Sequence, residues 1–133
     1  MLGAICRGQP ASPLAVAAVA DELPAVLGQG AIAGAPVPVF GDSRLVRDRD
    51  RALELAEVMG EAPSLIMRGN GALATASTTG RAMARLYLLE RSAETWLRAA
   101  AVGEPRPLSA EEAAAWQGAG EELLERLWDY LRR

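Results

Sequence analysis

The chain of 133 residues contains no histidine and no lysine, and each absence excludes a class of chemistry. Without histidine, the chain cannot build a Ser-His-Asp or Cys-His catalytic arrangement or a histidine-ligated zinc or iron site. Without lysine, it cannot form a Schiff base with a carbonyl compound or place a P-loop lysine on a phosphate. Taken alone, the chain is therefore a poor candidate for ordinary hydrolytic or metal catalysis.

Cysteine is also scarce, because Cys6 is the single thiol and no disulfide can form within the chain. Nothing in the cysteine content marks the chain as secreted. The apolar residues 1–20 lack a basic leading region and are interrupted by Arg7, Gln9 and two prolines, so we expect neither a signal peptide nor a membrane span. These features predict a cytoplasmic protein without a membrane partner.

Charge is low and mixed, since 14 arginines face 17 acidic residues and give a formal net charge of −3. The arginines are scattered along the chain, which argues against nucleic acid as a partner. Half of the residues are hydrophobic, few are aromatic, and this length suits one compact core. We therefore expect a single domain over residues 1–133.

Short apolar segments separated by glycine and proline predict strands and helices in alternation along the first part of the chain. A strand over residues 2–6 is followed by a Gly/Pro turn and by a helix, N-capped by Ser12, that reaches about Leu23. The glycines of residues 28–34 indicate an irregular stretch. The prolines of residues 36–40 predict an edge strand or an isolated extended segment.

Two amphipathic helices are predicted in the middle of the chain. Asp48 or Asp50 caps the first, which ends at Gly60. Its residues expected to face the core are Leu53, Ala56 and Met59. The second follows residues 79–80 and is expected to bury Met83, Leu86, Tyr87, Ala93, Leu97 and Ala100. Between them, an Asn-Gly turn over residues 68–71 joins a buried strand, 64–67, to a second strand, 72–76.

A C-terminal helical region is predicted over about residues 109–131. Ser109 caps it with Glu112 in the capping-box position, while Gly118 and Gly120 each weaken it by about 1 kcal/mol and predict a kink or break. Large apolar residues on this region form a candidate subunit interface, or they cover the domain's own sheet. These interface candidates are Trp116, Leu123, Leu127, Trp128 and Leu131.

Residues 65–72, LIMRGNGA, followed by GRAMA at 80–84 and LLERSA at 88–93, resemble the class II aldolase/adducin family. The family pattern is an apolar strand, Arg-Gly-His-Gly, a second strand, and a helix running through Leu-Glu-Arg-x-Ala. Residues 5–10, ICRGQP, occupy the place of the family's His-x-His-Pro turn, and residues 30–39 resemble its next extended segment. The resemblance covers essentially the whole chain, but only roughly the C-terminal half of the family domain.

The resemblance implies an α/β fold, a truncated three-layer α/β/α domain that lacks the N-terminal half and its acidic catalytic residue. In metal-dependent members, the histidines of His-x-His and Gly-His-Gly hold a divalent ion that polarises a carbonyl. Here those positions are Arg7, Gln9 and Asn70. Arginine cannot coordinate a cation, and amide oxygens are weak ligands for zinc, manganese or iron. We therefore expect no cofactor in this chain, although a partner subunit could hold a divalent metal.

The three replaced positions have more than one interpretation. Arg7, Gln9 and Asn70 are relics of a lost metal site, or they form a polar pocket that binds a carboxylate or carbonyl without metal. The Arg7 guanidinium suits a substrate anion, and it suits an acidic residue of a partner equally well. Asn70 within Gly-Asn-Gly is also explained by turn conformation alone.

Cys6 and Glu90 are two further site candidates. Cys6 lies in an apolar strand without a base to activate it, so we expect a small core residue rather than a nucleophile. Glu90 falls on the apolar stripe of its helix. It either bonds to the 69–71 loop or reaches solvent, and we expect a structural hydrogen bond.

These observations predict a catalytically degenerate subunit that associates with a full-length, metal-dependent class II aldolase-like lyase or decarboxylase and stabilises or completes its active site. The resemblance implies ring assembly, which a degenerate copy can retain after losing the chemistry. Half a layered domain also exposes a sheet edge and apolar surface unless a partner covers them. The alternatives are a metal-independent lyase or dehydratase that uses Arg7, Gln9 and Asn70, and a homo-oligomeric scaffold.

Overall fold

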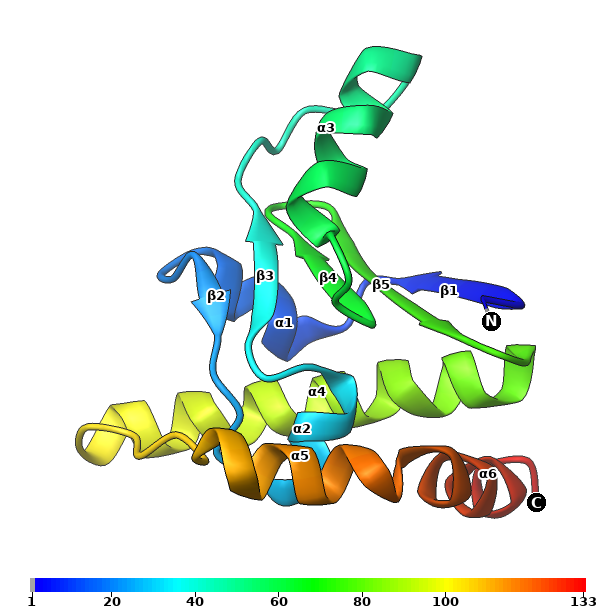
Figure 1. The fold of residues 1–133 in the computed structure, drawn as a ribbon. Helices are drawn as coiled ribbons and strands as arrows, with labels where there is room; N and C mark the ends of the chain where they lie inside the picture. Colours follow the sequence, from blue (N-terminus) through cyan, green and yellow to red (C-terminus); the bar gives the residue numbers. More distant parts are fainter. Residues whose placement is uncertain (1) are drawn as a thin grey trace.

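The computed structural model describes residues 2–133 and contains one five-stranded sheet with helices on both faces (Figure 1). The strands are β1 (Ala4–Gly8), β2 (Glu22–Leu23), β3 (Val37–Phe40), β4 (Ser64–Met67) and β5 (Gly71–Ala76). The helices are α1 (Ala11–Ala17), α2 (Gly28–Ala33), α3 (Arg49–Met59), α4 (Thr79–Val102), α5 (Ala110–Gly118) and α6 (Gly120–Leu131). The expected α/β fold class is confirmed.

The strands lie in the order β1-β5-β4-β3-β2, and only β3 and β4 run parallel. β4 and β5 form the predicted antiparallel hairpin. Gly69 and Gly71, at φ +67° and +130°, adopt left-handed backbone conformations that favour glycine. A side chain at position 71 would also collide with the backbone oxygen of Gly8 in β1. The hairpin turn and the end of β1 are therefore in close contact.

The extended segment with two prolines is not an edge or isolated strand, so that prediction is wrong. β3 lies between β4 and β2, and Val39 pairs with Ile66 of β4. Proline is tolerated here because the Val39 backbone N–H, and not one at position 38, donates to the Asp21 carbonyl oxygen at 3.1 Å, and because the pairing with β4 begins only at Val39. Leu23, which we expected at the end of a helix, is the buried residue of β2.

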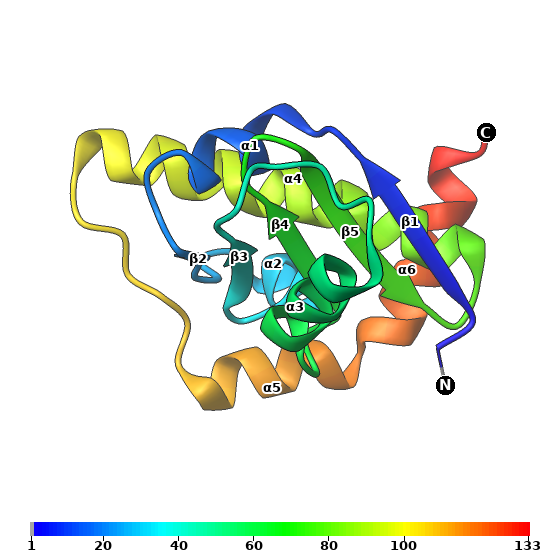
Figure 2. The same ribbon diagram turned by 90° about the horizontal axis from the view of Figure 1, so that it is seen from above.

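One face of the sheet carries the main core, where α4 packs across β1, β4 and β5, with α1 beside it (Figure 2). Helix α4 begins after the Thr78 cap, close to its predicted start. Its buried side includes Leu86, Leu89 and Ala93. Met83 and Tyr87, which we expected in the core, are exposed, because this part of α4 lies against the outermost strand, where no further strand covers it.

The opposite face carries only α3, which stands out from the sheet in Figure 1 and is seen in front of it in Figure 2. Asp48 caps α3 as predicted, by accepting from the Arg51 backbone N–H at 2.9 Å. The predicted core side of α3 is wrong in part. Leu55 and Met59 contact the small cluster of Phe40, Leu65 and Met67, whereas Leu53 is 55 % exposed and Ala56 is exposed too. Helix α3 buries no residue fully.

The N-terminal part of the helical layer differs from the sequence prediction at α1 and α2. Helix α1 ends at Ala17, and its N-cap residue is Pro10, which forms no side-chain capping hydrogen bond, rather than Ser12. The glycine-rich stretch is not irregular but forms α2, against α4 and α5. A side chain at Gly28 would collide with the Trp116 ring. These glycines therefore allow close helix packing rather than a turn.

The C-terminal region follows its prediction closely. Ser109 and Glu112 form the predicted capping box, and the helix breaks between Gly118 and Gly120 into α5 and α6. Helix α6 packs against α4, and α5 packs against α2. Among residues 2–133, no helix is both long and apolar enough to cross a membrane.

Candidate functional site

Arg7 and Asn70 meet where the end of β1 reaches the turn of the β4-β5 hairpin. Arg7 lies opposite Leu73 in the strand register, and its guanidinium Nη2 donates to Asn70 Oδ1 at 2.7 Å and to the Asn70 carbonyl oxygen at 3.3 Å. The turn fixes Asn70 in its place, because the Asn70 backbone N–H donates to the Met67 carbonyl oxygen at 3.0 Å. The sheet therefore brings together two side chains that are 63 residues apart in sequence.

Gln9 follows β1 directly and lies beside the same turn. Its Cγ lies close to Gly71, where the absence of a side chain leaves room for it. The structure thus gathers Arg7, Gln9 and Asn70 at one end of the sheet. Arg7 and Gln9 are exposed, and Asn70 is half-buried.

A cavity of about 500 Å³ opens beside Arg7 and Asn70, between the sheet and the segment that leads into α3. Its apolar lining includes Leu55, Met67 and Leu73, and Arg47 lines it from the segment before α3. Sequence analysis missed Arg47, because residues 48–51 suggested only a solvated helix start. The available signal was the density of arginine over residues 44–51.

Asp42 organises the segment that covers this cavity. Its carboxylate accepts from the backbone N–H and the guanidinium of Arg44 and from the guanidinium of Arg51. The hydrogen bonds from Arg44, followed by those from Arg51, hold the pKa of the Asp42 carboxyl well below its usual range. Two of the arginines in this segment are therefore already paired with a carboxylate.

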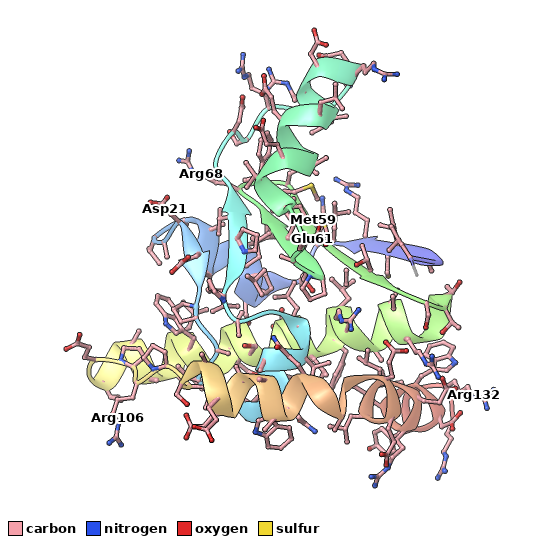
Figure 3. The ribbon with its side chains drawn as sticks, viewed as in Figure 1. Asp21, Met59, Glu61, Arg68, Arg106 and Arg132 are labelled. Carbon is pink, nitrogen blue, oxygen red and sulfur yellow. The ribbon has the colours of Figure 1, made fainter. Side chains whose placement is uncertain are left out.

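A second groove, of about 620 Å³, lies toward the other end of the sheet, below α3. Arg85 reaches it from α4 and donates through Nε to the Ile32 carbonyl oxygen at 3.0 Å and through Nη1 to the Thr75 carbonyl oxygen. Burial lowers the pKa of Arg85, and the Glu121 carboxylate opposes that shift. Glu61 and Glu121 also line this groove, so the Arg85 guanidinium has two carboxylates near it. Figure 3 shows Glu61 with Met59 at the end of α3 that faces the sheet.

Residues 4–97 match the model of the class II aldolase and adducin N-terminal domain. The chain belongs to the class II aldolase/adducin family. A 3,4-dihydroxyphthalate decarboxylase of Terrabacter sp. (strain DBF63) is 35 % identical over 85 residues, which cover 63 % of this chain and 36 % of that protein. The family model spans Arg7, Gln9 and Asn70.

Solved structures of the family share the fold. An L-fuculose 1-phosphate aldolase aligns with a TM-score of 0.79 and 23 % identity over 88 % of this chain and 55 % of its own. The L-fuculose 1-phosphate aldolase of Glaciozyma antarctica PI12 aligns at 0.77 and 19 % identity over 97 % of this chain and 51 % of its own. This chain spans about half the length of these solved relatives and about a third of the decarboxylase.

Because members of this family can be metal-dependent, we asked whether the side chains of Arg7, Gln9 and Asn70 could bind a divalent cation. They do not fit, because the Arg7 guanidinium keeps its positive charge and already occupies the Asn70 amide oxygen at 2.7 Å. The only other oxygen donor of the three side chains is the Gln9 amide, a weak ligand for zinc, manganese or iron. Over residues 2–133, no group of three or more His, Cys, Asp or Glu side chains is placed to hold a metal ion.

Glu90 and Cys6 have structural contacts in this family member. Glu90 accepts from the Ser12 backbone N–H at 3.0 Å and from the Ser12 hydroxyl at 2.5 Å. The expected structural hydrogen bond is confirmed, but its partner is the first turn of α1 and not the 69–71 loop. Cys6 packs against the main core and its Sγ lies 3.5 Å from Met83 Sδ.

The five interface candidates lie in two environments. Leu123, Leu127 and Trp128 are partly buried and pack against the main core, where the Trp128 ring lies over Gly80 of α4. Trp116 is 41 % exposed and contacts Gly28, and Leu131 is half-buried near the end of α6. Their role in a subunit interface stays a prediction.

Proposed function

We propose that this chain is a non-catalytic class II aldolase-family subunit that associates with a full-length, metal-dependent family member and stabilises or completes its active site. The observation that supports this most strongly is the contact between Arg7 Nη2 and Asn70 Oδ1. It occupies the place where the family resemblance puts metal-binding histidines. A fixed cation there opposes metal-dependent chemistry in this chain, while the fold that surrounds it is retained.

The partner's reaction is proposed to be cleavage of a carbon–carbon bond, and decarboxylation is favoured over aldol cleavage. The support is the similarity to the 3,4-dihydroxyphthalate decarboxylase, at 35 % identity over 85 residues. The aldolases are less similar in sequence, at 23 % and 19 % identity, and they support the fold alone.

The proposed contact surface is the outer strand β1 and the sheet face beside it. β1 is the outermost strand, so one of its edges has no neighbour within the described sheet. Leu2 and Ile5 are 61 % and 62 % exposed and line the groove below α3. Unpaired strand edges and exposed apolar residues favour association with another polypeptide. A family member that pairs with β1 would cover both.

Co-expression tests the proposal. The chain is co-expressed with a tagged, full-length decarboxylase of the class II aldolase family, taken from a neighbouring gene where there is one. The mass of the purified complex is then measured by native mass spectrometry. We expect a complex of defined stoichiometry in which the partner's melting temperature or decarboxylase rate rises, because binding stabilises the folded state. Separate elution of the two proteins at tens of micromolar would contradict the association.

Two exposed positions provide a matched pair of variants. Ile5→Asp places a charge on the proposed contact surface, whereas Val102→Asp places the same charge at the end of α4, where Val102 is 89 % exposed. We expect Ile5→Asp to weaken the complex about tenfold or more and Val102→Asp to leave it unchanged. Equal effects of the two variants would place the interface elsewhere.

The catalytic half of the proposal needs a separate assay. The isolated chain is expected to release no CO₂ from dihydroxyphthalate, with or without added Mn²⁺ or Zn²⁺. The metal-independent alternative predicts turnover by the isolated chain that disappears in Arg7→Gln. Such turnover would establish an enzyme and would refute the non-catalytic subunit.

A further inference from the structure

The cavity beside Arg7 has an unusual charge balance. It has about 500 Å³ of volume, which lies within the range of small-molecule sites. Within the described residues 2–133, its lining contains two arginines, Arg7 and Arg47, and no carboxylate. The groove toward the other end of the sheet has the opposite balance, with Glu61 and Glu121 beside Arg85. The two hollows on the same molecule therefore attract different ligands.

The two cations of the cavity keep their charge available for a ligand. In the covering segment, Asp42 is occupied by Arg44 and Arg51, and Asp48 accepts from the Arg51 backbone N–H as the cap of α3. Among residues 2–133, both acceptors of Arg7 belong to the neutral Asn70, and Arg47 donates no side-chain hydrogen bond. An anion that enters the cavity meets two guanidinium groups without an ion-pair partner.

Arg7 is also held in a defined orientation. Both of its contacts with Asn70 use Nη2, so the N–H groups of Nη1 and of Nε are left as separate donors for another acceptor. Asn70 is fixed in turn by its backbone hydrogen bond to Met67 at 3.0 Å. A charged N–H donor on a guanidinium held in this way forms a strong hydrogen bond with a carboxylate oxygen.

The remaining wall of the cavity is apolar. Met67 is buried, and Leu55 and Leu73 are partly buried members of the same cluster. A small inorganic anion would leave this wall in contact with water. A ligand with an apolar body covers it and gains free energy from the buried area.

From these observations we propose that the cavity binds a small carboxylate with an apolar body, whose carboxylate is held by Arg7 and attracted by Arg47. Asn70 is a positioning residue, because it orients the guanidinium without contacting the ligand. This inference goes beyond the proposed subunit role and does not depend on it, since a non-catalytic subunit and an enzyme could each carry such a site.

Calorimetry and NMR on the purified chain test the proposal with three probes, benzoate, its neutral analogue benzamide, and inorganic phosphate. We expect benzoate to bind and to shift the Arg7 Nε–H resonance. Benzamide is expected to bind at least about tenfold more weakly than benzoate, because it lacks the charge. Phosphate is also expected to bind more weakly than benzoate, because it lacks the apolar body. Equal binding of benzoate and benzamide, no binding of benzoate, or tighter binding of phosphate would overturn the proposal.

Three variants locate the site. Asn70→Asp is nearly isosteric and supplies an internal carboxylate beside Arg7, so it is expected to reduce benzoate affinity about tenfold or more while the melting temperature is kept. Arg7→Gln is expected to reduce it by at least as much. Arg106→Gln removes an exposed arginine far from α3, as Figure 3 shows, and is expected to leave binding unchanged.

Two results with these variants would contradict the proposed binding site. Undiminished benzoate binding in folded Asn70→Asp and Arg7→Gln would show that the cavity is not the binding site. An equal loss in Arg106→Gln would show that benzoate responds to the overall charge of the protein. Neither result depends on a partner, so the failure of this inference and the failure of the subunit proposal are distinguishable.

Discussion

The two faces of the sheet are built differently. On one face, α4 buries Leu86, Leu89 and Ala93 against the strands, and α1, α2 and α6 complete the layer. On the other face, α3 buries no residue fully, and the cavity of about 500 Å³ opens beside it, whereas the groove of about 620 Å³ extends from the end of α3 to Arg85 of α4. Arg7 and Leu73, which face each other across β1 and β5, line the cavity on this second face.

This difference indicates that the face covered by α4 stabilises the fold and that the face carrying α3 is available for binding. A face that excludes water contributes to the free energy of unfolding through buried area. A face that keeps hollows and unpaired arginines contributes little to it and remains available to a ligand or a second polypeptide. The comparison makes quantitative predictions for each face.

The largest difference is expected between two leucines. Leu89→Ala, on the covered face, leaves a cavity in the main core and is expected to lower the free energy of unfolding by about 3 kcal/mol. Leu53→Ala, on the exposed side of α3, is expected to change it by less than about 0.5 kcal/mol. Urea denaturation of both variants measures this difference, and similar losses would remove the distinction between the faces.

Trp128 provides the next test, because it is an interface candidate that packs on the covered face. Its ring lies over Gly80 and contacts the main core, so Trp128→Ala is expected to cost the isolated chain about 2 kcal/mol. Tyr130→Ala, at an exposed neighbouring position, is the control and is expected to have little effect. Weaker association with a partner at unchanged stability of the isolated chain would instead make Trp128 an interface residue.

Glu90 joins two helices of the covered face, and its effect is expected to be smaller. Glu90→Ala and Ser12→Ala each remove the contact that ties α1 to α4, at 2.5 Å between Glu90 Oε1 and the Ser12 hydroxyl. A double-mutant cycle is expected to give a coupling free energy of about 1 kcal/mol. Additive losses, with no coupling, would show that the hydrogen bond contributes nothing to the packing of α1.

Asp42 gives the smallest effect, on the face with the cavities. Its pKa is lowered in the folded chain from an ordinary value of 3.8, so its stabilising contribution is present above that value and is lost as pH falls below it toward the folded pKa. Asp42→Asn is therefore expected to be slightly less stable than the natural chain at pH 7 and to approach it as the solution is acidified below about pH 4. A difference that grows on acidification would contradict the assigned direction of the pKa shift.

The parts of the fold that sequence analysis predicted are those set by local chemistry. The Asn-Gly turn of the β4-β5 hairpin, the Asp48 cap and the Ser109 capping box each depend on residues within a few positions of one another. These elements were correct because their hydrogen bonds are local.

The errors share a tertiary cause. Helix α2 was missed because Gly28 serves a contact with Trp116, far away in sequence, and not a turn. Met83 and Tyr87 have the spacing of core residues, but spacing alone does not show that they lie beside the outermost strand. For α3, the periodicity gave a helix without showing how little of it the sheet covers.

The site was predictable only in part, for the same reason. The family resemblance singled out Arg7, Gln9 and Asn70, and the strand pairing brings them together. Arg47 reaches the same cavity because residues 42–51 fold over the sheet around Asp42, which no local pattern in the sequence indicated.

Elemental analysis tests the central claim most directly, that Arg7 and Asn70 replace a metal site with a direct side-chain contact. The natural chain and the triple variant Arg7→His, Gln9→His, Asn70→His are each dialysed against Zn²⁺ and Mn²⁺ and their bound metal is measured by mass spectrometry. We predict no stoichiometric metal in the natural chain and a gain of bound metal in the variant, because imidazoles supply the missing ligands. One tightly held ion per natural chain, lost on substitution of Gln9 or Asn70, would contradict the account.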